Sequence, residues 1–190
     1  KERPVNLLPS RLAPLTLVLA LCAPAAWAAP FTPGGDGTVT DAATGLAWDR
    51  CAWGQSGSAC EVGAPEALPW ADALAHAQAA NQQNHLGHAD WRVPNLKELE
   101  SLVDLAAADT AIDATAFPAT PATVFWSSTT DPTNTASARA INFYDGSSSG
   151  FNKSRGFALR LVRGGTGATS FDAQAPAPSA APTAVPTLSQ

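Results

Sequence analysis

Charged side chains are scarce in this chain and make up only 14% of its 190 residues. Basic residues number 11 and acidic residues 16, which leaves a formal net charge of -5 at pH 7. Proteins that bind nucleic acid or anionic membranes need a basic surface that displaces counterions. We therefore expect neither as a partner. So little charge also argues against a coiled coil, whereas 45% hydrophobic residues are too many for a wholly disordered chain.

The chain also lacks an apolar run of the roughly 20 residues that a membrane-spanning helix needs. The run at 12–26 is shorter, contains Pro14 and Pro24, and follows three basic residues. It ends at Ala26-Trp27-Ala28, which has small residues at both positions that a signal-peptide cleavage site requires. We predict that residues 1–28 are a secretory signal peptide and that the protein is secreted or displayed at the cell surface.

Cysteine is rare, with 3 in the chain, and Cys22 lies inside the predicted signal peptide. Cys51 and Cys60 remain as an even pair in a chain bound for an oxidising compartment, where disulfides persist. Zinc and redox sites usually place their cysteines closer together, and no second pair exists to complete a tetrahedral site. We predict a Cys51–Cys60 disulfide and no metal or cofactor.

The C-terminal residues 166–190 are rich in Ala, Pro, Ser and Thr and almost free of charge. Such a segment cannot bury enough apolar area to offset the entropy of ordering it, so we predict a disordered stalk. Its last six residues, from Val185 to Gln190, resemble the opening of a bacterial VPTLS sorting signal. The resemblance implies cell-surface anchoring through a segment that would follow Gln190.

Residues 29–165 are expected to form one domain. The stretch from Asp36 to Trp48 alternates turn formers with β-branched and aromatic residues, which is typical of a hairpin. Apolar residues at helical spacing predict a helix from Trp70 to about Ala80. Asn95 and Glu98 have the spacing of a capping box at the start of a second helix.

The second half of the domain is strand-like. Turn residues at Asp131-Pro132, Asp145-Gly146 and the Ser147 to Gly150 run separate three predicted strands, at 124–129, 138–144 and 157–163. Strands followed by two helices and further strands indicate the α+β class.

Five separated motifs resemble the Lcl C-terminal domain family in order and spacing. They are Gly37-Thr38-Val39-Thr40-Asp41, Thr44-Gly45-Leu46-Ala47-Trp48, the run from Asp90 to Leu99 (DWRVPNLKEL), Phe125-Trp126-Ser127-Ser128 and the run from Leu159 to Gly164 (LRLVRG). The resemblance implies a bacterial secreted or surface-displayed domain. It also implies a C-type-lectin-like fold, with a small twisted antiparallel sheet, two helices and paired terminal strands.

Two properties of relatives are not implied. The chain lacks the collagen-like repeats of the adhesin that names the family, so trimerisation through such repeats does not carry over. Formylglycine-generating enzymes, which share the fold, need cysteines near the end of the domain, and this chain has none after Cys60.

Most conspicuous side chains are expected to be architectural. Trp48, Trp91 and Trp126 are expected in the core, because each would bury a large apolar area. Charged residues near them are expected to satisfy backbone groups or one another: Asp90, Arg92, Arg160 and Arg163.

Catalytic and metal-binding patterns are weak. His85, His88 and Asp90 form an H-x-x-H-x-D string that suits a transition metal, but a polar loop explains the string better. The stretch from Gly54 to Ser58 misses the final glycine of a nucleophile elbow. We expect no enzymatic activity.

A ligand-binding surface is predicted between Ala138 and Arg155. This stretch concentrates Ser, Asn, Tyr and two cations, which make adaptable contacts when they are held on a rigid scaffold. Ile141 and Phe143 are expected to point inward. The candidate binding residues are Asn142, Tyr144, Asp145, Ser147, Ser149, Asn152, Lys153 and Arg155.

The function expected from the sequence is a binding or adhesion module that recognises an extracellular glycan, protein or matrix polymer. One alternative is a structural envelope component without a specific ligand, in which this stretch is only a solvated turn region. Another is a hydrolase acting on an envelope polymer.

Overall fold

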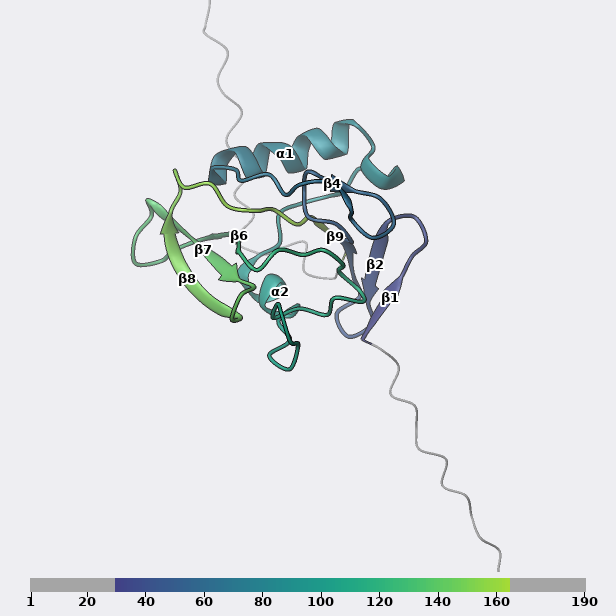
Figure 1. Cartoon of the computed structure of the whole chain (residues 1–190). Coiled ribbons are helices and arrows are strands. Elements are labelled where there is room, and N and C mark those ends of the chain that lie inside the picture. Colours follow the sequence, from purple (N-terminus) through teal and green to yellow (C-terminus); the bar gives the residue numbers. More distant parts are fainter. Residues whose placement is uncertain (1–29, 165–190) are drawn as a thin grey trace, which may run out of the picture.

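Three small antiparallel sheets and two α-helices build the described part of the chain, residues 30–164 of this computed structural model (Figure 1). The α+β class predicted from the sequence is confirmed, while the relation to C-type lectins stays a prediction. The predicted signal peptide (1–28) and stalk (166–190) lie outside the described residues. Within residues 30–164, no helix has the length and apolar character needed to cross a membrane.

The first sheet unites both ends of the domain. Its strands are β1 (Phe31–Pro33), β2 (Thr38–Asp41), β3 (Leu46–Asp49) and β9 (Val162–Gly164), hydrogen-bonded in the order β1-β2-β3-β9. The predicted hairpin is β2 and β3, whose turn is closed by the Asp41 carboxylate accepting from the Ala43 amide at 2.9 Å. The C-terminal strand pairs with β3, so the terminal strands share one sheet.

The second sheet contains β6 (Val124–Thr130), β7 (Ser137–Asn142) and β8 (Ser147–Asn152), in that order. The prediction that Ser147 to Gly150 is a turn is wrong, because these residues form most of β8 and pair with β7. The turn lies just before them, where Gly146 adopts a φ of 74° and donates its N–H to the Asn142 carbonyl at 2.7 Å. A serine run has little strand propensity of its own, so its pairing depends on the neighbouring strand.

Both predicted helices are present. Helix α1 (Trp70–Gln82) buries small residues on one face: Ala73, Ala77 and Ala80. Helix α2 (Leu96–Glu100) begins with the predicted capping box, in which the Asn95 side chain accepts from the Glu98 amide at 2.9 Å and the Glu98 carboxylate accepts from the Asn95 amide at 2.8 Å. A short 3-10 helix (His85–Gly87) follows α1.

The segment from Phe157 to Gly164 joins the parts of the domain. Only its end forms β9, so the strand is shorter than the predicted 157–163. Before β9 the chain makes single bridges to Leu68 and Phe125, and Val162 also bridges Arg92. One extended segment therefore contacts the α1 region, the second sheet and the first sheet in succession.

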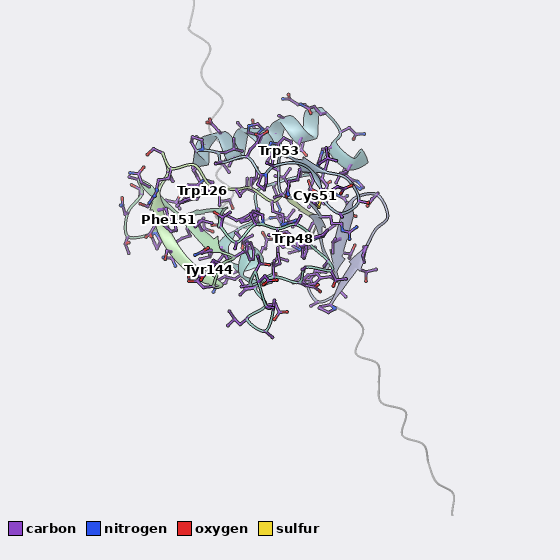
Figure 2. All side chains as sticks on the ribbon, viewed as in Figure 1. Trp48, Cys51, Trp53, Trp126, Tyr144 and Phe151 are labelled. Atoms are coloured by element: carbon purple, nitrogen blue, oxygen red, sulfur yellow. A yellow bond between two sulfur atoms is a disulfide. The ribbon has the colours of Figure 1, made fainter. Side chains whose placement is uncertain are left out.

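Two apolar clusters fill the space between these elements. Trp48 lies fully buried in one cluster and Trp126 in the other; both are labelled in Figure 2. Trp91 is 2% exposed. The three tryptophans predicted to be core are confirmed as core.

The predicted disulfide between Cys51 and Cys60 is confirmed, with the two Cα atoms 5.3 Å apart. It closes a loop that contains strand β4 (Gln55–Ser56), and the partner strand β5 (Val62–Gly63) follows just beyond the loop. The Arg50 guanidinium also holds this loop by donating to the Ser58 carbonyl at 2.7 Å.

Opening this loop should cost stability. Replacing both Cys51 and Cys60 with serine is expected to lower the free energy of unfolding by about 2 to 3 kcal/mol, because the unfolded chain regains the entropy that the cross-link removed. Urea denaturation of oxidised wild type and of the double variant measures the difference. Two alkylatable thiols in unreduced wild-type protein would contradict the disulfide itself.

Candidate functional site

The predicted binding residues lie along β8, at the outer edge of the second sheet (Figure 1). We call the surface formed by residues 142–155 the β8 surface. Its support is rigid, because Ile141 and Phe143 are both 0% exposed and Phe143 packs edge-on against Phe125 with ring centroids 5.2 Å apart. The predicted inward direction of Ile141 and Phe143 is confirmed.

One end of the β8 surface is the turn between β7 and β8. The Asn142 side chain accepts from the Tyr144 amide at 3.1 Å, and the Asp145 carboxylate accepts from the amide and hydroxyl of Ser147 at 3.0 and 2.7 Å. These two Ser147 bonds, the hydroxyl bond foremost, lower the pKa of Asp145, so its carboxylate is charged at neutral pH. The turn leaves Tyr144 71% exposed.

The other end carries two cations held on aromatic rings. Lys153 Nζ lies 4.0 Å from the centre of the Trp70 ring and donates to Thr130 Oγ1 at 3.0 Å. The Arg155 guanidinium lies over two rings, 5.6 Å from that of Phe157 and 5.9 Å from that of Phe151. Cations above aromatic faces are attracted by the ring quadrupole, so both side chains are oriented before any ligand arrives.

The middle of the surface is polar and small. Ser147 and Ser149 are exposed on β8, whereas Ser148 is half-buried and accepts from the Arg139 guanidinium at 3.2 Å. Gly150 lies against the Asp131 carboxylate, which would clash with any side chain at this position. Asn152 turns back on the chain, since its side chain accepts from the amide and hydroxyl of Ser154.

The structure therefore places the eight candidate residues on one sheet edge but in two groups. Asn142 ends β7, Tyr144 and Asp145 lie in the turn before β8, and Lys153 and Arg155 follow its last residue. Exposed serines connect the groups. Such an arrangement suits an extended ligand that contacts both ends of β8 better than a small molecule that needs one enclosed pocket.

Sequence reasoning missed the residues that position the two cations. From the sequence, Trp70 is predicted only to begin a helix face. In the structure its indole N–H donates to the Ser127 carbonyl at 2.8 Å, and its ring lies under the Lys153 ammonium. Phe157 is predicted only to be part of a strand. No local signal could have joined Trp70 to Lys153, because this contact connects distant parts of the chain. The contact of Phe157 with Arg155 is local, since the two residues are two positions apart.

A hollow of about 320 Å³ lies elsewhere on the domain, between the first sheet and the segment after α2. Its lining includes three carboxylates, but each is committed to a local turn: Asp41 binds Thr44, Asp104 binds the Ala106 amide and Asp113 binds the Thr115 amide. These bonds explain the acidic residues without a ligand.

The histidine string does not converge on one point. His85 Nε2 lies 2.7 Å from the Asp49 carboxylate, while His88 Nε2 lies 3.5 Å from that of Asp36. Asp90 instead accepts from the Arg163 guanidinium at 2.7 Å. Across the described range, no group of three or more His, Cys, Asp or Glu residues has a metal-binding arrangement.

Four charged residues of the DWRVPNLKEL and LRLVRG motifs form two ion pairs. Arg92 makes two hydrogen bonds to the Glu98 carboxylate, at 2.6 and 2.7 Å, and so ties the motif loop to the first turn of α2. Arg163, on the last strand, is bound by Asp90. Arg92 and Asp90 on either side of Trp91 thus brace the loop that holds this tryptophan in the core.

These features define a small disulfide-bonded α+β domain with an exposed polar sheet edge. The sequence matches the model of the Lcl C-terminal domain over residues 37–163, and the chain belongs to this family. Membership suggests a surface or secreted module. No curated protein matches the chain.

Proposed function

We propose that this domain is a secreted or surface-displayed binding module without catalytic activity, and that it recognises an extracellular glycan, protein or matrix polymer through the β8 surface. The observation that carries the proposal is the pre-ordered state of that surface. Tyr144 is exposed on a turn fixed by Asn142 and Asp145, and Lys153 is held on Trp70. Preorganised side chains lose little entropy on binding, which favours affinity.

Charge supports a ligand other than nucleic acid. The chain carries 11 basic and 16 acidic residues, and this excess of negative charge repels a phosphate backbone. The β8 surface combines donors, acceptors, an aromatic ring and charges of both signs. Polymers that present hydroxyl, amide and carboxylate groups match this chemistry.

The test is the paired variant Tyr144→Ala, Lys153→Ala. Binding to glycan arrays and immobilised matrix proteins should be lost while the fold is kept, because Tyr144 is mostly exposed and removing the Lys153–Trp70 contact costs only about 0.5 to 1 kcal/mol. Affinity is measured on the arrays and stability by urea denaturation.

A matched control changes the same number of exposed side chains elsewhere. Lys97 and Val62 are 86% and 56% exposed, and Lys97→Ala, Val62→Ala should leave binding unchanged. Unchanged affinity in the folded Tyr144, Lys153 variant would remove the proposed site. If wild type binds nothing on either array, the structural envelope role becomes the better explanation.

A further inference from the structure

Strand β8 has an open edge. It pairs with β7 on one side, and within residues 30–164 no strand pairs with its other side. Lys153 donates its N–H to the Ala136 carbonyl at 3.0 Å, which continues the β7–β8 ladder one pair beyond Ser137 and Asn152. Because N–H and C=O groups alternate in direction along an antiparallel strand, the backbone groups of Ser148, Gly150 and Asn152 point away from β7. Of these groups, the Asn152 carbonyl also accepts from the Arg155 amide at 3.0 Å, in the turn that ends the strand.

Nothing in the strand protects this edge. Proteins usually blunt an edge strand with a charge, a proline or a bulge. The six residues of β8 are Ser-Ser-Ser-Gly-Phe-Asn, and they pair with β7 in unbroken register. By contrast, β1 at the edge of the first sheet has three residues and ends at Pro33.

The two ends of β8 carry opposite charge. Asp145 precedes the strand, and Lys153 and Arg155 follow it. Within the described residues, neither Asp145 nor Arg155 belongs to an ion pair, because the length of the strand separates them. An antiparallel copy of the same strand would bring the start of one β8 to the end of the other.

The ladder fixes the register of such a pairing. In such a pairing, the residues whose backbone groups point away from β7 must lie opposite the same kind of residue in the second copy. The register that pairs Ser148, Gly150 and Asn152 places Gly150 opposite Gly150 of the second copy. It also places Ser148 opposite Asn152 of that copy.

Asp145 lies in the turn before β8, and Arg155 follows the turn after Asn152, so neither residue is part of the ladder. The same register nevertheless brings the turn that carries Asp145 toward the segment of the second copy that carries Lys153 and Arg155, twice, because the arrangement has a twofold axis. Opposite charges brought close across paired strands stabilise the pairing.

We propose that two copies of this chain associate through antiparallel pairing of their β8 edges, forming one continuous sheet across a twofold axis. The contact uses backbone groups and leaves the exposed side chains of Ser147 and Ser149 on the faces of the combined sheet. Two β8 surfaces then lie side by side in one particle, and a polymeric ligand with repeated epitopes would bind both.

The experiment uses the whole chain without ligand, so its failure would leave the proposed binding function standing. Sedimentation equilibrium should show a reversible monomer–dimer equilibrium. Asp145→Lys and Arg155→Glu should each weaken self-association about tenfold, because each reversal places like charges together at both symmetry-related positions. Lys97→Glu, an exposed reversal on α2, should leave it unchanged.

A mixture of the Asp145→Lys and Arg155→Glu variants tests the proposed charge pairing directly. A mixed dimer of Asp145→Lys with Arg155→Glu restores an opposite-charge pair at both positions, so association should return to the wild-type level. The amides of Ser148 and Gly150 should also become protected from hydrogen exchange as wild-type protein is concentrated. A monomer at all concentrations, no recovery on mixing, or association without protection of these amides would overturn the proposal.

Discussion

Replacing Arg160 with methionine is expected to lower the free energy of unfolding by about 3 to 5 kcal/mol. Arg160 is 0% exposed, although it is a charged residue. Its guanidinium donates to the Asp49 carbonyl at 2.8 Å, to the Arg50 carbonyl and to Thr120 Oγ1 at 2.7 Å. Methionine fills similar space but leaves these acceptors without a donor, and each unsatisfied buried acceptor costs about 1 to 3 kcal/mol.

Removal of the buried positive charge offsets part of the stability that the Arg160→Met variant loses. Burial lowers the pKa of Arg160 to about 10, although the nearby Asp49 carboxylate opposes that shift, so the group is still protonated at neutral pH. Its guanidinium lies 4.8 Å from the centre of the Phe117 ring, which partly replaces the lost hydration. Removing the cation therefore relieves some desolvation, and the expected loss is smaller than the sum of the broken hydrogen bonds.

Arg163→Met is the matched control, since Arg163 lies three residues further along the same segment. Its partner Asp90 has a side chain that is 54% exposed, and such surface pairs are worth about 0 to 1 kcal/mol. Urea denaturation of both variants measures the two losses. If Arg160→Met lowered the free energy of unfolding no more than Arg163→Met does, the buried hydrogen bonds of Arg160 would not be what holds the segment after Gly156 in place.

Local signals explain which parts of the fold were predictable. The capping box of Asn95 and Glu98 and the apolar spacing after Trp70 act within a few residues, and both helices form where these signals place them. The hairpin at Thr38–Asp49 is similarly local. Strand β8 was missed because Ser147 to Ser149 carry turn chemistry, and only the neighbouring β7 makes them a strand.

The candidate site was predictable in composition but not in arrangement. The sequence indicates that Tyr144 is exposed next to the buried Phe143, because strand side chains alternate. It does not indicate that the Lys153 ammonium lies over the Trp70 ring, since the two residues are far apart in the chain. The burial of Arg160 is equally non-local, because its acceptors come from Asp49, Arg50 and Thr120.

Trp91→Ala is expected to cost about 3 to 5 kcal/mol of stability or to prevent folding, as removal of a buried aromatic side chain does. Trp91 is 2% exposed, and its indole N–H donates to the His85 carbonyl at 2.8 Å. Its backbone is fixed as well, because the Asn81 side chain accepts from its amide at 2.6 Å and donates to its carbonyl at 2.8 Å. The backbone of Trp91 thus links its loop to the end of α1, and its ring links the loop to the 3-10 helix.

Two further substitutions separate the contributions of this residue. Trp91→Phe keeps most of the apolar volume but loses the N–H donor. The His85 carbonyl still accepts from the His88 amide at 3.0 Å, so the cost should be only about 1 kcal/mol, that of one hydrogen bond. Tyr144→Ala removes an aromatic ring that is 71% exposed and should change stability by about 0.5 kcal/mol or less. Thermal melting ranks the three variants. A Trp91→Ala curve close to wild type would mean that the ring is accessible in solution, and Trp91 would then become a candidate for stacking on a ligand.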